Sequence, residues 1–255
     1  MISQWDLLDP ITKEGKALYL AYDHGLEHGP TDFNDQNVDP EFILKLAVRG
    51  QYQAIVLQKG IAEKYYAPYK DKIPLILKLN GKTALEGGEP YSPMICTVQE
   101  AQELGALAVG ATVYIGSLHE PKMLEDFAKI VYEAHHNNLP VIGWMYPRGE
   151  KILDDSDPAI LAYSARVGLE LGADMIKIKY SGDKKSFSWI VKSAGKVKVV
   201  AAGGLKRNEA DFFQQVKDIM AAGAKGLAVG RNVWQRANPL VITEKLKKII
   251  WSKDV

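Results

Sequence analysis

Short apolar segments alternate along this chain with amphipathic segments, and this alternation recurs from end to end. The apolar segments lack polar residues at every second position, as expected of parallel strands covered on both faces. We predict strands at residues 17–23, 54–58, 74–79, 106–114, 140–146, 173–179, 197–203 and 224–230. Eight strands alternating with helices predict a single (β/α)8 TIM barrel rather than an open doubly wound sheet. No strand is followed directly by GxGxxG, which argues further against a dinucleotide-binding fold.

Helix start and stop signals lie between the predicted strands. An acidic or amide residue precedes proline and opens a helix at four places: Asp39, Glu120, Asp157 and Asn238. Thr97 and Glu100 have the spacing of a capping box. Gly105, Gly172 and Gly223 are placed just past helix ends, where a left-handed conformation favours glycine.

Length and composition fit one globular unit over residues 1–255. The net charge of +1 provides no global field for binding nucleic acid or an anionic membrane, so any anion site must be local. The single cysteine, Cys96, excludes an internal disulfide framework and suits the reducing cytoplasm. The N-terminal residues lack the basic and apolar regions of a signal peptide, and no apolar stretch reaches transmembrane length. We therefore expect a cytoplasmic protein.

Polar side chains and glycines gather at the carboxyl ends of the predicted strands, which is the catalytic end of such barrels. They include residues of strands one, two, three, five, six, seven and eight: Asp23, His24, Gln58, Lys59, Lys78, Asn80, Trp144, Tyr146, Arg148, Lys177, Lys179, Gly203, Gly204, Gly230 and Arg231. Structural stability alone would place polar groups at both ends of the barrel. The one-sided distribution therefore predicts a functional site.

Lys177 is the candidate nucleophile, because it lies inside the predicted sixth strand. Burial penalises its ammonium form, and Lys179 lies on the same strand face, so both effects are expected to lower the pKa of Lys177. A neutral lysine can attack a carbonyl carbon and form a Schiff base. The structural alternative is a lysine whose ammonium reaches water at the strand mouth.

The glycines after strands seven and eight suggest a phosphate site. Barrels often bind phosphate there through backbone N–H groups and the N-terminus of a short helix, which residues 232–236 could supply. The alternative is that Gly203, Gly204 and Gly230 only form tight turns. Paired glycine sites after two neighbouring strands favour phosphate.

A metal site is the other interpretation of the segment after strand one, where Asp23, His24, Glu27 and His28 are all ligand types. A divalent cation would stabilise an enolate, but an iminium on Lys177 offers the same electron sink. We therefore predict no metal and no cofactor. His24 and His28 then contact the substrate or shape the loop.

The chain resembles the archaeal-type class I fructose-1,6-bisphosphate aldolases over essentially its whole length. The resemblance rests on long motifs in a shared order: AYDHGLEHGP, GIAEKYY, PLILKLNGKT, WMYPRG, GADMIKIKYSGD, FSW and AVGRNVWQR. It implies that Lys177 forms the Schiff base, that Tyr146 is the acid/base group beside Trp144, and that Asp23 is a further active-site residue. One departure is Ala202 before Gly203 and Gly204, where the family has serine. This change removes a hydroxyl contact to phosphate and leaves the backbone donors.

The resemblance implies reversible cleavage of fructose 1,6-bisphosphate to dihydroxyacetone phosphate and glyceraldehyde 3-phosphate in glycolysis and gluconeogenesis. We expect Arg148 and Arg231 to contact the phosphorylated substrate. A tyrosine of ordinary pKa, about 10, is a poor base at neutral pH, so we expect the Lys177 or Lys179 cation to lower the pKa of Tyr146. The resemblance also implies a homo-oligomer, a decamer built from pentamers.

Two alternatives remain open at this point. A related Schiff-base aldolase or transaldolase, of the type that makes an aminodideoxyheptulosonate, would share Asp23, Tyr146 and Lys177 and differ in substrate contacts. A non-catalytic barrel that binds sugar phosphates would keep the phosphate loops but would not need a lysine in strand six.

Overall fold

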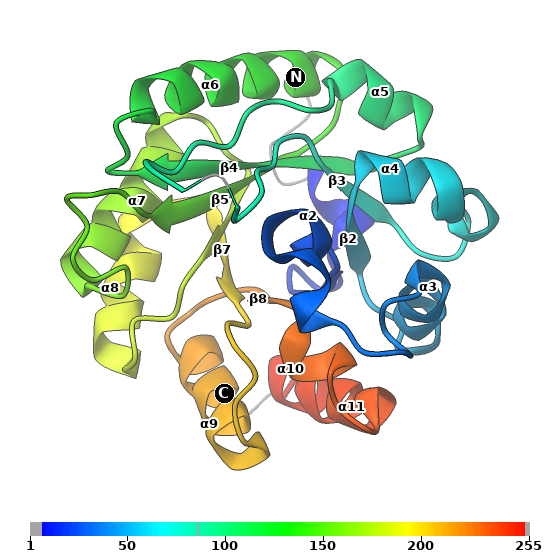
Figure 1. The fold of residues 1–255 in the computed structure, drawn as a ribbon. Coiled ribbons are helices and arrows are strands. Elements are labelled where there is room, and N and C mark those ends of the chain that lie inside the picture. Colours follow the sequence, from blue (N-terminus) through cyan, green and yellow to red (C-terminus); the bar gives the residue numbers. More distant parts are fainter. Residues whose placement is uncertain (1–6, 86, 253–255) are drawn as a thin grey trace.

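A closed barrel of parallel strands forms the centre of the molecule in the computed structural model, which describes residues 7–85 and 87–252 (Figure 1). The strands pair in chain order, and the last pairs with the first. Their bounds are β1 Ala17–Ala21, β2 Ala54–Gln58, β3 Leu75–Lys78, β4 Ala108–Ile115, β5 Val141–Pro147, β6 Met175–Ile178, β7 Lys198–Ala202 and β8 Gly226–Val229. The predicted TIM barrel is therefore confirmed.

The helices surround the barrel as an outer ring (Figure 1). The longer ones are α3 Pro40–Arg49, α6 Glu120–His136, α7 Pro158–Glu170, α8 Lys184–Ser193, α9 Glu209–Ala221 and α11 Pro239–Ile250. Short helices follow several strands: α2 His24–His28, α4 Lys59–Ile61, α5 Val98–Glu103 and α10 Arg231–Trp234. Further single turns cover residues Asp9–Ile11, Gly29–Asp32, Ala62–Tyr66 and Ala67–Tyr69.

The helix punctuation of the sequence is largely confirmed. Thr97 and Glu100 form the capping box, and the side chains of Asp39 and Asp157 accept hydrogen bonds from the first turns of α3 and α7. The side chain of Asn238 makes no such bond, and α6 begins at Glu120 itself. The three glycines predicted to follow helix ends have φ between +80° and +97°, which is the conformation that glycine adopts without strain.

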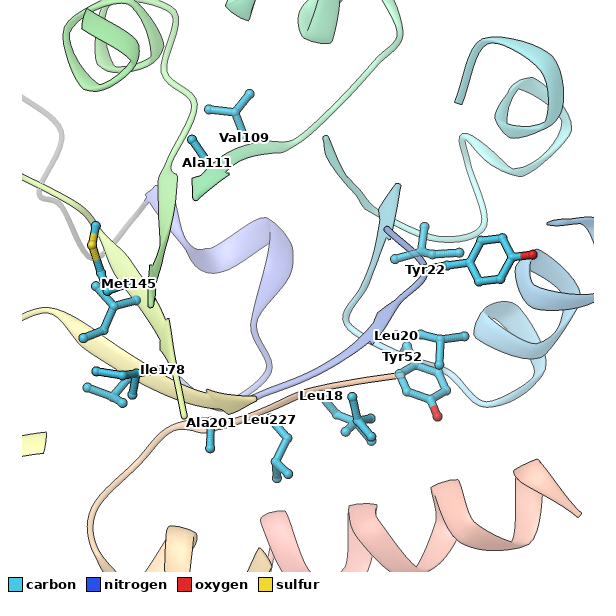
Figure 2. Packing of buried hydrophobic residues seen from close by; sticks show 14 of the residues in the cluster. Leu18, Leu20, Tyr22, Tyr52, Val109, Ala111, Met145, Ile178, Ala201 and Leu227 are labelled. Atoms are coloured by element: carbon cyan, nitrogen blue, oxygen red, sulfur yellow. The ribbon is translucent and has the colours of Figure 1, made fainter. Parts of the chain in front are cut away.

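Two apolar layers hold the barrel together. Alternate strand residues point outward into a large core beneath the helices, and Figure 2 shows Leu18, Leu20 and Leu227 in this layer. The other residues point inward and fill the barrel with side chains that include Tyr19, Met175 and Trp144. The interior is thus packed below its carboxyl end, which leaves that end for a cavity.

Most strands are shorter than predicted, and more residues are lost at their amino ends than at their carboxyl ends. β1 ends at Ala21 rather than Asp23, and β6 covers Met175–Ile178 rather than 173–179. Asp23 and Lys179 therefore belong to the loops at the barrel mouth.

In the described part of the chain, no helix is both long and apolar enough to span a bilayer.

Candidate active site

A cavity of about 520 Å³ opens at the carboxyl ends of the strands. All the residues to which the sequence assigned a catalytic or substrate-binding role line it, whereas the strand-end residues Gln58, Lys59, Lys78 and Asn80 of β2 and β3 do not. The predicted residues are Asp23, His24, His28, Trp144, Tyr146, Arg148, Lys177, Ala202, Gly203, Gly204, Gly230 and Arg231. Loops far apart in the sequence thus converge on one site.

Lys177 lies on β6 beside Trp144 of β5, and its side chain is buried. The Lys177 Nζ atom is 5.1 Å from the centroid of the Trp144 ring. Burial lowers the pKa of Lys177, and the nearby Arg231 cation lowers it further, while Asp23 and Glu27 act in the opposite direction. The net effect favours the neutral amine, which is the nucleophilic form.

The expectation that Lys179 assists this shift is wrong. Lys179 is partly exposed and pairs with Asp155 in the loop after β5. Lys179 is thereby held by a carboxylate at the rim of the cavity. The second cation that acts on the pKa of Lys177 is Arg231, from the loop after β8.

A second buried lysine, Lys78, is the main residue that the sequence did not assign. It lies at the end of β3, with Nζ 3.6 Å from Asp23 Oδ2 and 5.0 Å from the Trp144 ring centroid. Burial would raise the pKa of Asp23, but the Lys177 and Lys78 cations together lower it below its ordinary value. Asp23 is therefore an ionised carboxylate next to the nucleophile. The only signal in the sequence was the position of Lys78 at a strand end.

The Trp144 ring fits inside the barrel because the neighbouring strand β4 has a glycine, Gly110, against the ring. A Cβ atom on Gly110 would lie 1.9 Å from the Trp144 ring, so no other residue fits there while the ring keeps its place. The indole Nε1 is buried and has no hydrogen-bond partner among the described residues. Gly110 is thus part of the site's architecture although it has no functional group.

Tyr146 and Arg148 line the cavity at β5, and the buried Tyr114 of β4 lies beside Arg148. The Arg148 guanidinium carbon is 5.3 Å from the Tyr114 ring centroid and 5.8 Å from that of Tyr146. Tyr114 donates a hydrogen bond of 2.5 Å to Glu27. Arg148 is exposed and has no ion-pair partner among the described residues.

The pKa of Tyr146 shifts opposite to the predicted direction. Burial raises it well above 10, and the carboxylates of Asp23 and Glu27 raise it further. Cations lower it only in part, and those that act are Arg148 and Arg231 rather than Lys177 or Lys179. Tyr146 is therefore protonated in the free protein, which makes it an acid before it can act as a base.

The opposite side, at β7 and β8, has the features of an anion site. Gly204 has a φ of +68°, and its N–H has no hydrogen-bond partner among the described residues. Arg231 begins α10, and its buried Nε also lacks a partner in the described chain, while Nη1 is 3.3 Å from Asp32. The buried Asn232 fixes this geometry, because its amide donates to the carbonyls of Gly203 and Leu205.

Gly203 and Gly230, two of the predicted phosphate-binding residues, also have structural roles. The N–H of Gly203 already donates to the carbonyl of Ala228. At Gly230, a Cβ atom would lie 2.5 Å from the His24 ring and 2.8 Å from the carbonyl oxygen of Ala21. The absence of a side chain at Gly230 thus lets His24 pack close to the backbone.

The two histidines of the loop after β1 differ in environment. His24 is packed edge-on against Trp234, and burial lowers the pKa of His24 to about 4, so it is neutral. His28 Nδ1 is 2.6 Å from Asp32 Oδ2, the carboxylate that also pairs with Arg231. Across the described residues, no three His, Cys, Asp or Glu side chains form a group that could hold a metal ion.

The sequence matches the model of a family described as DeoC/LacD family aldolase over residues 17–236. The chain belongs to this aldolase family. The relatives include the class 1 fructose-bisphosphate aldolase of Thermoproteus tenax, 52% identical over 94% of this chain and 91% of the relative. The enzyme of the same name from Halobacterium salinarum is 46% identical over 96% of this chain and 94% of its own.

A solved structure agrees with these relatives. It is an archaeal fructose-1,6-bisphosphate aldolase whose catalytic lysine is covalently bound to the carbinolamine intermediate of the substrate. It superimposes with a TM-score of 0.94 at 50% identity, over 98% of this chain and all of the other. In this member of the aldolase family, burial lowers the pKa of two lysines in the barrel, Lys78 and Lys177, and Lys177 is the one that the sequence motif assigns as the nucleophile.

Proposed function

We propose that this chain is a class I aldolase that reversibly cleaves fructose 1,6-bisphosphate through a Schiff base on Lys177. The observation that carries the proposal is a buried lysine of lowered pKa beside an ionised carboxylate, in a cavity with an anion site at one side. The named relatives and the solved structure support the same reaction.

The reaction begins when the neutral amine of Lys177 attacks the C2 carbonyl of the open-chain sugar. Tyr146 is protonated and is our choice for the acid that delivers a proton to the carbonyl oxygen. Loss of water then converts the carbinolamine to a protonated imine. The positive nitrogen is next to the ionised Asp23, which acts as its counter-ion.

Cleavage follows because the iminium withdraws electrons from the C3–C4 bond. The C4 hydroxyl gives its proton to the Tyr146 phenolate, the C3–C4 bond breaks, and glyceraldehyde 3-phosphate leaves. Tyr146 then protonates C3 of the enamine, and hydrolysis releases dihydroxyacetone phosphate. A high pKa suits this cycle, because the phenolate forms only after a positive charge has developed on Lys177.

The substrate phosphates are assigned to the two sides of the cavity. One phosphate binds the Gly204 backbone and Arg231 at the start of α10. Ala202 lines this phosphate site but has no hydroxyl group to donate a hydrogen bond. The other binds Arg148, which has no carboxylate partner in the described chain. Asp32, which is held by His28, keeps Arg231 in place. His24 packs against Trp234 and so supports the loop after β1.

The experiment that tests the proposal combines an activity assay with chemical trapping. The purified protein is expected to cleave fructose 1,6-bisphosphate after treatment with a chelator as fast as before it. Borohydride with dihydroxyacetone phosphate is expected to add the mass of the reduced ketose phosphate, and borohydride alone is expected to add nothing. Zinc-dependent activity without a trapped adduct would contradict both the Schiff base and the absence of a metal cofactor.

We also propose that residues 1–255 work as one catalytic domain of a cytoplasmic homo-oligomer, a decamer built from pentamers as the family resemblance implies. Exposed aromatic residues on neighbouring helices support an assembly surface, with Tyr163 on α7 and Trp189 on α8 exposed by 66% and 59%. Light scattering is expected to give a mass several times that of one chain. A monomer at micromolar concentration would contradict it.

A further inference from the structure

Glu27 is a carboxylate of the cavity that the mechanism above does not use. It lies on α2, and its side chain crosses the barrel mouth to reach Tyr114 of β4, 87 residues further along the chain. Oε1 accepts the Tyr114 hydroxyl at 2.5 Å. Oε2 is 4.0 Å from His28 Nε2, beyond hydrogen-bonding distance, and makes no hydrogen bond to another residue in the described chain. One acceptor atom therefore remains available in the cavity.

The surroundings keep this carboxylate charged. Burial would raise the pKa of Glu27, but the Lys78 cation, the Tyr114 hydrogen bond and Arg148 together lower it. An ionised carboxylate repels a phosphate and accepts hydrogen bonds from hydroxyl groups. The chemistry of the free oxygen thus fits a sugar hydroxyl.

The position of Glu27 indicates which part of the substrate this hydroxyl belongs to. With C2 bound to Lys177 on β6 and one phosphate at β7 and β8, the sugar continues from C3 toward β5 and β4. That side of the cavity holds Tyr146, Arg148, Tyr114 and the end of the Glu27 side chain. It is the side that receives the aldehyde half, which carries the second phosphate.

We propose that Glu27 selects the aldehyde, by accepting a hydrogen bond from the hydroxyl on C2 of glyceraldehyde 3-phosphate. This hydroxyl is the one on C5 of the bisphosphate. The inference rests on the proposed function and adds a specificity residue to it. Tyr114 positions Glu27 by holding Oε1, which directs Oε2 to the substrate.

The test compares two aldehydes in condensation with dihydroxyacetone phosphate. Glyceraldehyde 3-phosphate carries the hydroxyl, whereas 3-phosphonooxypropanal has the same chain and phosphate without it. The wild-type protein is expected to prefer the first in kcat/KM. In Glu27→Gln the ratio of the two kcat/KM values is expected to fall by roughly 10- to 100-fold, as for loss of a hydrogen bond to a charged group.

Matched variants separate this role from a structural one. Glu133→Gln changes an exposed glutamate of α6 and is expected to leave the ratio unchanged. Tyr114→Phe is expected to lower the ratio less than Glu27→Gln does, because the carboxylate remains. If Glu27→Gln instead reduces the rates with both aldehydes equally, Glu27 only supports the loop and the proposal is wrong.

Two further readouts keep the inference distinct from the proposed function. A wild-type protein without preference between the aldehydes would overturn the role of Glu27, whether or not the variants fold. Failure of the wild-type protein to form a borohydride adduct with dihydroxyacetone phosphate would count against the Schiff base itself. If Glu27→Gln forms the borohydride adduct and also shows a lowered ratio of the two kcat/KM values, the result supports both the Schiff base and the role of Glu27.

Discussion

Replacement of Lys177 by methionine is expected to lower the aldol cleavage rate by roughly 10⁴-fold or more, the scale seen when a covalent nucleophile is removed. The methionine keeps an unbranched apolar side chain beside Trp144 and lacks only the reactive nitrogen. Because the variant replaces a buried polar amine by an apolar side chain, we do not expect its thermal midpoint to fall. A steady-state assay and a melting curve therefore separate lost chemistry from lost folding.

The trapped adduct identifies the covalent residue directly. Borohydride with dihydroxyacetone phosphate should label the peptide that contains Lys177, and the label should disappear in Lys177→Met. Lys78→Met and Lys179→Met are the matched controls and should still form an adduct at Lys177. An adduct on Lys78 or Lys179 would overturn the assignment.

The pH dependence of trapping follows from the sign of the pKa shift. The nucleophile is the neutral amine, which predominates above the pKa of Lys177. Because burial lowers that pKa below the ordinary lysine value, the trapping rate should reach half its maximum at a lower pH than for an exposed lysine. A half-maximum near pH 10.5, the ordinary lysine pKa, would contradict the observed environment.

The barrel was predictable because each strand is covered on both faces and therefore appears in the sequence as a short apolar segment. The strand boundaries were less accurate because local hydrophobicity does not show where pairing stops. Asp174 illustrates this at the start of the sixth segment. Its carboxylate accepts the N–H of Val141 and contacts His135 at 2.9 Å, so it closes the bottom of the barrel instead of extending β6.

The members of the site were predictable for a different reason. The carboxyl ends of all strands in a parallel barrel meet at one face, so polar residues there must converge whatever their distance in the sequence. The sequence did not predict which charged or polar side chains contact one another within the site. Lys78 meets Asp23 across β1 and β3, and Glu27 meets Tyr114 across the mouth. Such contacts depend on side-chain direction, which no local pattern encodes.

The direction of the pKa shift of Tyr146 also could not be predicted from the sequence. The sequence places Tyr146 in the same site as the Lys177 and Lys179 cations, which predicts a lowered pKa. In the folded chain burial is the dominant effect, and two carboxylates from the segment after β1 add to it. The sign of the shift is therefore decided by the fold. The consequence is a change in the order of proton transfers, with Tyr146 acting first as an acid.

Tyr146→Phe is expected to reduce turnover by about a hundredfold to ten-thousandfold, the usual contribution of a positioned acid/base group. That loss equals roughly 3 to 5 kcal/mol of transition-state stabilisation. The substitution removes only the hydroxyl, so the ring still packs beside Arg148 and the phosphate contacts remain. Substrate affinity should therefore change much less than turnover. Tyr132→Phe, at an exposed position of α6, is the matched control.

The decisive comparison is turnover against adduct formation in the same variant. Lys177 and its surroundings are intact in Tyr146→Phe, so a reducible adduct with dihydroxyacetone phosphate should still accumulate, although more slowly. Since Tyr146 is protonated in the free protein, the wild-type rate should show no alkaline loss from its ionisation below pH 10. If turnover in the variant stays within a few-fold of wild type, the proton travels by another route. Asp23 is then the next candidate, because its ionised carboxylate lies in the same site, 3.6 Å from Lys78 Nζ.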